Sequence, residues 1–341
     1  MEGKKKNGLK IGVDLGTVNT LVYVAGKGVV FNEPSVVAYN NETGETIGVG
    51  KEAAKMVGKT HERIKISMPL HLGVISDIKS AGTLIEYVLD NLDKESHDLS
   101  ESTLLLCCPS EVTQIERESL IELASDLGIG ECFIEEEVKA GVIGAGVDIF
   151  TPHGTMVIDL GGGSTDIGVL SLGDIVTSES IRVAGTYFDE AIIKHIQFNH
   201  QVLIGSISAE KIKKQIGTLN EELSGTFDTM KIAGRDLLTG LPKEIEITQK
   251  EIRDVLVECF EEIVNTAQRV LQQTPPELAA DIINDGIIVN GGGALIKGIE
   301  EFLSNRLNVV VKTTSNPLTA ICEGTKVLLK NSGSYLVKPL D

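Results

Sequence analysis

Short apolar runs that end in glycine recur along the chain. They are Leu9–Leu15 before Gly16, Met156–Leu160 before Gly161, and Ile287–Val289 before Gly291. A run of this length is typical of a buried strand, and the glycine that follows favours a tight turn, because glycine adopts positive φ and admits close backbone approach. The pattern therefore predicts a buried strand at each of these places.

Helical periodicity separates these strands. Residues 110–127 are expected to form a helix with one apolar face, which comprises Val112, Ile115, Leu120, Leu123, Ala124 and Leu127. Residues 248–272 are expected to form a longer helix that begins with a capping box between Thr248 and Glu251 and ends before two prolines. Strands that alternate with helices predict a layered α/β fold.

One internal repeat organises the chain. The segment Asp14–Thr17, with the sequence Asp-Leu-Gly-Thr, recurs in the second half as Asp159–Thr165, with the sequence Asp-Leu-Gly-Gly-Gly-Ser-Thr. Each copy follows an apolar run and ends in hydroxyl residues. The simplest architecture that accounts for the repeat is a duplicated α/β domain in which each half contributes an aspartate-tipped turn to one cleft.

Length, charge and composition narrow the class of protein. At 341 residues the chain is long enough for about two domains. Its 49 acidic residues outnumber its 31 basic residues, and the net charge of −18 excludes a general nucleic-acid binder. The N-terminus has no signal-peptide pattern, and no apolar run approaches the roughly 18–20 residues that span a bilayer. A globular cytoplasmic protein is expected.

The cysteines and histidines give no indication of a metal site. The five cysteines are odd in number and lack C-x-x-C spacing, so we expect buried, reduced thiols. The six histidines also lack metal-ligand spacing. Of these, His195 and His200 are expected on the surface of a helix.

The first aspartate loop carries the chemistry of a phosphate site. Gly16, Thr17 and Asn19 follow Asp14 at the end of a predicted strand, so backbone N–H groups and a hydroxyl can face a phosphate. A carboxylate beside a phosphate requires a cation between the two, which predicts Mg²⁺. The alternative is a strand-end aspartate that only caps a turn.

The second aspartate loop is richer in glycine. Gly161, Gly162 and Gly163 keep side chains out of the turn, so backbone amides can surround phosphate oxygens. Neither loop matches the G-x-x-x-x-G-K-[ST] pattern, and neither opens a helix as the dinucleotide-binding G-x-G-x-x-G pattern does. A flexible glycine turn is the alternative for either loop taken alone.

A third glycine cluster, Gly291, Gly292 and Gly293, follows a strand, leads into a predicted helix, and would let a purine and ribose lie against the backbone. In this order the three loops resemble those of the actin-like ATPases, which include actin, sugar kinases and DnaK-like chaperones. Further segments narrow the resemblance to the MreB family of bacterial actins, namely Phe31–Val37, Cys108–Glu116, Ile143–Gly146, Phe188–Ile192 and Pro275–Ala279. The resemblance extends from about residue 9 to about residue 330.

The resemblance implies a fold and a division of the chain. We expect an α/β fold of duplicated actin-like (ribonuclease H-like) domains around an interdomain nucleotide cleft, each domain with a smaller subdomain. The first domain would comprise residues 1–32, 66–145 and 319–341 as subdomain IA and residues 33–65 as subdomain IB. The second would comprise residues 146–181 and 243–318 as subdomain IIA and residues 182–242 as subdomain IIB.

The same resemblance implies roles for individual residues. Asp14 and Asp159 match the two acids that hold Mg²⁺ largely through water. Glu137 matches the residue that orients the attacking water. Ser164 is expected to be catalytic together with these three acids. Lys55 resembles the lysine that DnaK-like proteins direct at the phosphates, and an ordinary surface lysine is the alternative. The positions that match phosphate clamps for ATP or ADP are Gly16, Thr17, Asn19, Gly161, Gly162, Gly163 and Thr165.

The adenosine contacts are expected on a short helix. It would begin at Ser208 as N-cap and end at Gly217. Glu210, Lys213 and Lys214 would share one of its faces, because residues three and four apart are neighbours on a helix. The resemblance matches these three to adenosine-contacting positions and places the third glycine cluster beside the same nucleoside. An exposed, ion-paired face is the alternative.

Several positions depart from the MreB pattern. Val138-Lys139 stand where MreB usually has Pro-Met, Ser164 and Asp166 replace the usual Thr and Glu, and Asn290 replaces Thr. All three acids of the site are retained. The rate of hydrolysis is therefore left open.

The function implied by the resemblance is that of a cytoskeletal ATPase that polymerises and supports cell shape or motility. Head-to-tail contacts between copies do not close on themselves, so they generate filaments, with single and paired protofilaments both open. Three alternatives remain: a small-molecule kinase, a chaperone-type ATPase, and a scaffold that binds ATP without cleaving it. Peripheral contact with the inner face of the cell membrane is also open, since Lys4–Lys6 would attract anionic lipid, whereas the loop Asp93–Glu101 is acidic.

Overall fold

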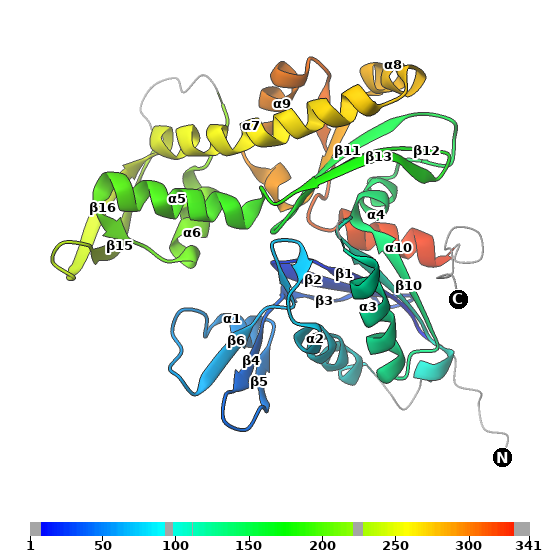
Figure 1. The fold of residues 1–341 in the computed structure, drawn as a ribbon, viewed down its shortest axis with the longest axis horizontal. Helices are drawn as coiled ribbons and strands as arrows, with labels where there is room; N and C mark the ends of the chain where they lie inside the picture. Colours follow the sequence, from blue (N-terminus) through cyan, green and yellow to red (C-terminus); the bar gives the residue numbers. More distant parts are fainter. Residues whose placement is uncertain (1–7, 93–97, 111, 221–227, 331–341) are drawn as a thin grey trace. The chain divides into compact units, whose positions relative to one another are not determined.

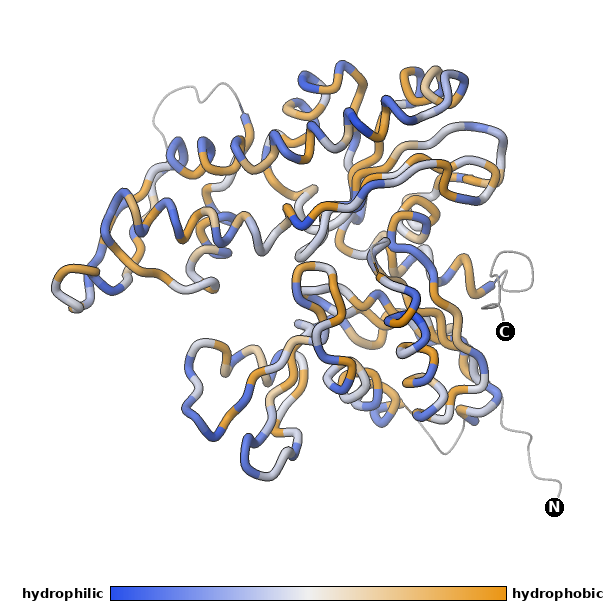
Figure 2. The backbone as a smooth tube through the Cα atoms, in the orientation of Figure 1, coloured by the Kyte–Doolittle hydropathy of each residue, from blue (hydrophilic) through white to orange (hydrophobic). Residues whose placement is uncertain are grey.

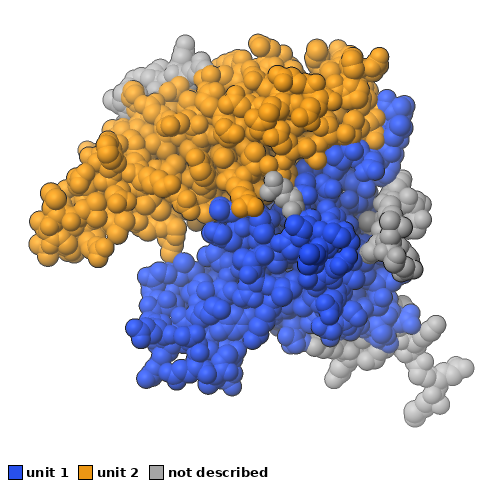
Figure 3. Space-filling model, in the orientation of Figure 1, with its two compact units in different colours: residues 1–152, 172–175, 318–341 blue, residues 153–171, 176–317 orange. Residues whose placement is uncertain are grey.

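The computed structural model describes residues 8–92, 98–110, 112–220 and 228–330, and its chain forms two compact units (Figure 3). Unit 1 comprises residues 1–152, 172–175 and 318–341, and unit 2 comprises residues 153–171 and 176–317. The trilysine Lys4–Lys6 and most of the loop Asp93–Glu101 lie outside the described residues. The finer division into four subdomains stays a prediction.

Unit 1 is built on a five-stranded sheet with the strand order β10-β9-β1-β2-β3 (Figure 1). Its strands are β1 (Lys10–Leu15), β2 (Asn19–Val24), β3 (Gly28–Pro34), β9 (Thr103–Cys108) and β10 (Glu131–Glu136). Strands β1, β2 and β3 form an antiparallel meander, whereas β9 and β10 run parallel to β1. The central strand β1 is buried along most of its length, as is typical of a strand covered on both faces.

Smaller elements complete unit 1. A three-stranded sheet and a two-stranded hairpin follow β3, with the members β4 (Val37–Asn40), β5 (Thr46–Val49), β6 (Ile64–Ser67), β7 (Leu70–His71) and β8 (Val74–Ile75). The helices are α1 (Lys51–Ala54), α2 (Ile78–Asp90), η1 (Leu99–Glu101), α3 (Gln114–Asp126), α4 (Glu137–Gly144) and α10 (Ala320–Lys330).

Unit 2 repeats the sheet of unit 1, with the strand order β13-β12-β11-β17-β18. Its strands are β11 (Thr155–Leu160), β12 (Thr165–Ser171), β13 (Asp174–Ile181), β17 (Ile287–Asn290) and β18 (Val311–Thr313). Strand β12 is antiparallel to β11, while β17 and β18 are parallel to it. Each aspartate loop therefore joins the first two strands of an equivalent sheet, which confirms the predicted duplication of an α/β domain.

The other elements of unit 2 are mostly helical. They are α5 (Gly185–His200), α6 (Ser206–Ile216), α7 (Gln249–Gln273), α8 (Pro276–Asp285), η2 (Gly292–Leu295), α9 (Ile299–Leu307) and a small sheet of β14 (Val202–Leu203), β15 (Thr229–Asp236) and β16 (Pro242–Thr248). Polar and apolar residues alternate along α7 (Figure 2). Its buried side includes Phe260, whose ring lies 5.1 Å from that of Phe188 and 6.1 Å from that of Phe302. These rings tie α5, α7 and α9 into one core.

The expected strands and the long helix are confirmed. The three apolar runs form β1, β11 and β17, and α7 begins with the capping box between Thr248 and Glu251. The third glycine cluster leads first into the short helix η2 rather than directly into an α-helix.

Two helix predictions need correction. Helix α3 begins only at Gln114, after a capping box between Thr113 and Glu116, and Ile115 is 74% exposed rather than part of the apolar face. Helix α6 begins at Ser206 with Gly205 as N-cap, so Ser208 does not cap it. Ile115 matches the apolar period but lies in the first turn of α3, before the buried Leu120 and Ala124. In α6 the N-cap position is occupied by Gly205, three residues before the hydroxyl residue Ser208.

The last described helix returns to the first sheet. Helix α10 packs on β1 and on α4, and Lys10 Nζ donates a hydrogen bond to the Leu329 carbonyl. Glycines make the crossing of α4 and α10 very close: a Cβ at Gly324 would lie 1.9 Å from the Ala140 carbonyl oxygen, and one at Gly144 would lie 1.7 Å from that of Ala320. Since real Cβ atoms do not approach so closely, glycine is required at both positions.

Candidate functional site

The aspartate loop of unit 1 is a tight connection between two antiparallel strands. Asp14, the penultimate residue of β1, is buried and lies opposite Leu21 of β2. The Ser35 hydroxyl donates a 2.6 Å hydrogen bond to the Gly16 carbonyl, so the Thr17 N–H of the same trans peptide points the other way. A Cβ at Gly16 would lie 2.6 Å from the Asn19 carbonyl, so the turn needs glycine there.

Acidic side chains gather at the same edge of the unit 1 sheet. Asp14 of β1 and Glu135 of β10 both lie opposite Cys107 of β9, and Glu137 follows as the first residue of α4. Burial, with the charges of these three acids, raises the pKa of the Cys107 thiol. Burial also raises the pKa of Asp14 from 3.8 to about 7. A carboxylate desolvated in this way is stabilised in its charged form by a cation, which fits the chemistry of a magnesium site.

Glu137 is buried at the start of α4, where the helix leaves the sheet. Lys139, one of the departures from the MreB pattern, directs its ammonium group to Glu135 at 3.0 Å. The adjacent Glu136 lies 3.7 Å from Arg117. Each neighbouring acid of Glu137 therefore has its own cationic partner.

The aspartate loop of unit 2 is held by the start of α5. The Gly185 N–H donates to the Gly161 carbonyl at 3.2 Å, and the Thr186 N–H donates to the Gly162 carbonyl at 2.8 Å. In a trans peptide the carbonyl and the next N–H point in opposite directions, so the amides of Gly162 and Gly163 point away from α5. Two successive amides directed to the same side form an anion-binding arrangement.

The hydroxyl residues of this loop are buried. Thr165 Oγ1 donates a 2.5 Å hydrogen bond to the Val183 carbonyl, which ties the start of β12 to the segment before α5. Ser164 is buried, and its carbonyl accepts a 3.0 Å hydrogen bond from the Gly161 N–H. The loop is therefore held by a hydrogen bond within it as well as by its hydrogen bonds with α5.

Asp159 and the third glycine cluster lie together in unit 2. Asp159 is buried in β11 opposite Asn290 of the parallel strand β17. Gly291 has φ of 80°, and a Cβ there would lie 2.3 Å from the Leu160 carbonyl oxygen and 2.9 Å from Asp159 Oδ1. Among the described residues, neither polar atom of the buried Asn290 amide has a hydrogen-bond partner. Such an amide beside a buried carboxylate suits a site whose remaining partners come from a ligand.

The three charged residues of α6 have different partners. Lys214 and Glu210 form an exposed pair at 2.6 Å, as in the alternative interpretation. Lys213 instead points to α5, where its Nζ lies 2.9 Å from Asp189 Oδ1 and 2.8 Å from the Gly185 carbonyl. The three residues stand three and four positions apart on α6, as the prediction required, and their contact with adenosine stays a prediction; Lys213 also ties α6 to the helix that holds the unit 2 loop.

Lys55 lies at the surface of unit 1 and pairs with a residue of the preceding helix. Lys55 follows α1 and is 68% exposed, with its ammonium group 2.6 Å from Glu52.

Four of the five cysteines are buried, Cys132 is half-buried, and burial raises the pKa of every one of these free thiols. Protonated thiols are poor nucleophiles and metal ligands, which is consistent with a structural role.

Sequence reasoning missed a cluster of metal-ligating side chains. His195 and His200 of α5 meet Glu251 of α7, with ligand atoms within 4.8 Å of one another. The spacing of the histidines along the sequence does not match a metal-ligand pattern. The capping box did place Glu251 in the first turn of its helix, but its approach to α5 depends on tertiary packing.

A family model and curated relatives match nearly the whole chain. The model described as MreB/Mbl protein matches residues 8–336. The cell shape-determining protein Mbl of Bacillus cereus is 44% identical over 321 residues, which cover 94% of this chain and 96% of the relative. The cell shape-determining protein MreB of Escherichia coli K12 is 36% identical over 318 residues, which cover 92% of this chain and 91% of the relative.

Solved structures also match nearly the whole length of this chain. MreB5 of Spiroplasma citri bound to AMPPNP superposes with a TM-score of 0.91 at 43% identity, over 96% of this chain and 98% of that one. The same protein has also been solved bound to ADP. A MamK double helical filament superposes with a TM-score of 0.80 at 22% identity, over 95% of this chain and 99% of that one, which supports the fold alone. In the part of the chain that the structure describes, no helix has the length and apolar character needed to cross a membrane.

Proposed function

This chain belongs to the MreB/Mbl family, and from that premise we propose that it is a cytoskeletal, actin-like ATPase. It binds Mg-ATP, assembles head to tail into filaments in the cytoplasm, and hydrolyses ATP to ADP and phosphate. Relatives are named for determining cell shape, and the similar MreB5 has been solved with AMPPNP and with ADP. Both support a nucleotide-dependent cytoskeletal role.

The observation that carries the proposal is the duplicated aspartate loop. In each five-stranded sheet the penultimate residue of the first strand is a buried aspartate, Asp14 in β1 and Asp159 in β11. A glycine turn follows each aspartate; the Thr17 N–H points away from the Ser35 hydroxyl, and the Gly162 and Gly163 N–H groups point away from α5. Two such loops acting on one nucleotide would supply a carboxylate and backbone donors from each unit.

The residues present suit a bound magnesium ion and ATP. Asp14 and Asp159 would hold Mg²⁺, largely through water, and the ion would neutralise charge on the phosphates. The amides of Thr17, Gly162 and Gly163 would donate hydrogen bonds to phosphate oxygens, and this backbone contact needs the absence of side chains that the glycines provide.

Glu137 is the residue best suited to act on the attacking water. Its carboxylate is buried at the sheet edge that also carries Asp14, and the cations Lys139 and Arg117 are engaged by its neighbours Glu135 and Glu136. A carboxylate held there accepts a hydrogen bond from water, orients it in line with the terminal phosphate, and receives its proton.

The adenosine would be bound in unit 2. The third glycine cluster, which follows Asp159's neighbouring strand, leaves room for ribose and base beside the backbone, while Glu210 and Lys214 on α6 supply polar contacts. Lys213 would act on adenosine binding indirectly, because its contacts with Asp189 and Gly185 hold α6 against the start of α5.

A surface of unit 2 suits contact with a second copy of the chain. Phe198 at the end of α5 is 80% exposed and Leu238 of the β15–β16 hairpin is 83% exposed, and Leu237 and Leu241 beside Leu238 are also exposed. Phe198 and Leu237 line the same shallow hollow, together with Lys194, Gln197 and Gln201. We call these four apolar residues, Phe198, Leu237, Leu238 and Leu241, the hairpin patch. Since exposed apolar patches mark interaction sites, we assign the hairpin patch to the filament contact.

The test is phosphate release with Mg-ATP over a wide range of protein concentration. A threshold above which release rises steeply, coincident with sedimentable polymer, supports an assembly-coupled ATPase. A rate strictly proportional to concentration indicates a stand-alone ATPase and contradicts the proposal. Polymer without phosphate release indicates an ATP-locked scaffold, which overturns the hydrolytic part.

A further inference from the structure

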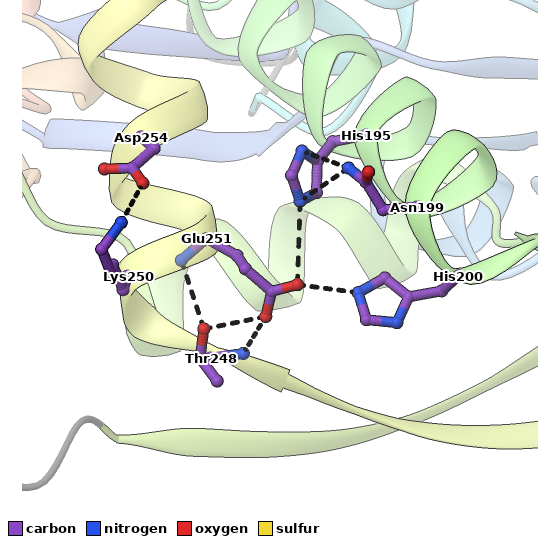
Figure 4. A network of polar contacts seen from close by, with 7 residues as sticks. All are labelled: His195, Asn199, His200, Thr248, Lys250, Glu251 and Asp254. Carbon is purple, nitrogen blue, oxygen red and sulfur yellow. Dashed lines mark hydrogen bonds and ion pairs between the residues drawn. The ribbon is translucent and has the colours of Figure 1, made fainter.

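Two histidines of α5 and a glutamate of α7 converge in unit 2, as Figure 4 shows. His200 Nε2 lies 2.9 Å from Glu251 Oε1, and His195 Nε2 lies 3.9 Å from the same oxygen. His200 is the last residue of α5, whose first residue, Gly185, contacts the glycine loop. At 1.5 Å per residue these helix ends are roughly 22 Å apart, so the cluster is separate from the nucleotide loops.

The carboxylate of Glu251 is already positioned by its own helix cap. The Thr248 N–H and the Thr248 hydroxyl each donate a 2.8 Å hydrogen bond to Glu251 Oε2. The other oxygen, Oε1, is the one that both histidines approach (Figure 4). A ligand oxygen oriented by hydrogen bonds to its partner oxygen is the outer-shell support that metal sites use.

The first histidine also has a neighbour that sets its orientation. The Asn199 amide nitrogen, one turn further along α5, lies 3.1 Å from His195 Nδ1 and 3.3 Å from His195 Nε2. Nitrogen and carboxylate oxygen together suit Zn²⁺ and its neighbours in the transition series better than Mg²⁺ or Ca²⁺.

The separations are close to those that a bound ion requires. With metal–ligand bonds of about 2.0–2.1 Å, tetrahedral geometry puts ligand atoms about 3.3 Å from one another. The separations of the two histidine nitrogens from Glu251 Oε1, 2.9 and 3.9 Å, lie on either side of that value, and all three ligand atoms lie within 4.8 Å of one another. All three side chains are half-buried, so water would be able to complete the coordination of a bound ion.

We propose that His195, His200 and Glu251 form a binding site for a divalent transition-metal ion, with Zn²⁺ as the best match. The ion would join the C-terminal end of α5 to the N-terminal turn of α7. Because a ligand that binds only the folded state stabilises it, occupancy would raise the stability of unit 2.

The test is titration of the full, tag-free chain with Zn²⁺ in the absence of nucleotide, followed by calorimetry. We expect one ion per chain, and at least tenfold weaker binding in His195→Gln and in His200→Gln. Glu251→Gln, which retains a capping-box residue, is expected to weaken binding as well. The matched control is His153→Gln, which removes the histidine that pairs with Asp281 and Asp285 elsewhere in unit 2 and should leave affinity within twofold.

A second readout separates metal binding from structural damage. Melting curves recorded in chelator establish that each variant folds, and Zn²⁺ should then raise the melting temperature of the parent and the control but not of the histidine variants. Co²⁺ should give the spectrum of nitrogen and oxygen ligands. Failure of the parent to bind Zn²⁺, equal affinity in the histidine variants, or thiolate bands with Co²⁺ would each overturn the proposal.

Discussion

Asp159 and Asn290 lie opposite each other at the carboxyl ends of the parallel strands β11 and β17, and both are buried. The amide of Asn290 has no hydrogen-bond partner for either polar atom among the described residues. A buried polar group left in that state costs about 1–3 kcal/mol of stability. Its position beside the proposed magnesium ligand therefore fits a role in binding better than a role in folding.

Replacing this amide should separate stability from nucleotide binding. In Asn290→Leu, which keeps the branched shape but removes the polar atoms, we expect equal or greater stability, by up to about 1–3 kcal/mol, because the desolvation cost disappears. Affinity for Mg-AMPPNP should fall. Denaturant melts and nucleotide titration measure the two effects, with Asn290→Thr as the polar control. Lower stability together with unchanged affinity would contradict the assignment.

Glu137→Gln should impair hydrolysis without impairing binding. Loss of the carboxylate removes the group that orients water and accepts its proton, so we expect single-turnover phosphate release to slow by about 10²–10⁴-fold. Mg-AMPPNP affinity should stay within a few-fold of the parent. The matched control is Glu136→Gln, which alters the adjacent acid that lies beside Arg117. An equal rate in Glu137→Gln would show that another group positions the water.

A charge in the hairpin patch should prevent assembly. In Leu238→Glu, we expect sedimentation in Mg-ATP to be lost, because the carboxylate would be desolvated in a contact between copies. Nucleotide binding by the monomer should be unchanged. Ile47→Glu supplies the control, since Ile47 of β5 is an exposed apolar residue of unit 1. Normal polymer from Leu238→Glu would exclude this patch as the contact.

The β15–β16 loop, which carries the three leucines of the hairpin patch, depends on one carboxylate, and this gives a pH dependence. Asp236 Oδ1 accepts hydrogen bonds from the Leu238 and Thr239 N–H groups, and Lys243 lies 3.0 Å from Oδ2. The backbone hydrogen bond from Thr239, then Lys243, lower the pKa of Asp236 from 3.8 to about 2. Because the pKa of the folded state is the lower one, the stabilisation is present above pH 3.8 and is lost as pH falls through about 2.

We therefore expect Asp236→Asn to lower the urea midpoint at pH 7 and pH 5 by the same amount. The difference from the parent should begin to shrink only below about pH 4, where the unfolded chain takes up the proton. Urea unfolding at several pH values, with constant ionic strength, measures the effect. A difference that stays constant down to pH 2 would mean that the charge of Asp236 is not what stabilises the loop.

The close crossing of α4 and α10 predicts a sharp stability effect. A Cβ at Gly324 would lie 1.9 Å from the Ala140 carbonyl oxygen, so Gly324→Ala should destabilise the protein by about 1–3 kcal/mol through overpacking, despite the better helix propensity of alanine. Gly205→Ala is the control, because a Cβ there meets nothing within 4 Å. Equal denaturation midpoints for the two variants would show that the helices separate without cost.

The sequence predicted those parts of the fold that local pattern determines. The apolar runs before glycine became strands, and the capping box of Thr248 and Glu251 fixed the start of α7, because these signals act within a few residues. The repeat of Asp14 and Asp159 revealed the duplication, since two equivalent loops needed two equivalent sheets.

Features that depend on packing could not be predicted in this way. Lys213 and Lys214 are neighbours in sequence, yet only Lys213 finds Asp189, because that partner lies on another helix. Ile115 fitted the apolar period but precedes the part of α3 that packs on the core. The meeting of His195 and Glu251 requires α5 and α7 to be assembled, so no spacing along the chain could indicate it.

The return of α10 to the first sheet also bears on how the protein is made. Unit 2 is almost continuous in sequence, so its core can close on the ribosome as soon as residue 317 has emerged. Domains usually fold in the order of synthesis. Here the N-terminal unit receives one of its packing elements last, because α10 packs on β1, where a Cβ at Gly12 would lie 2.1 Å from Thr325 Oγ1. A nascent chain that stalls before residue 320 would therefore present chaperones with a finished second half and an open first half.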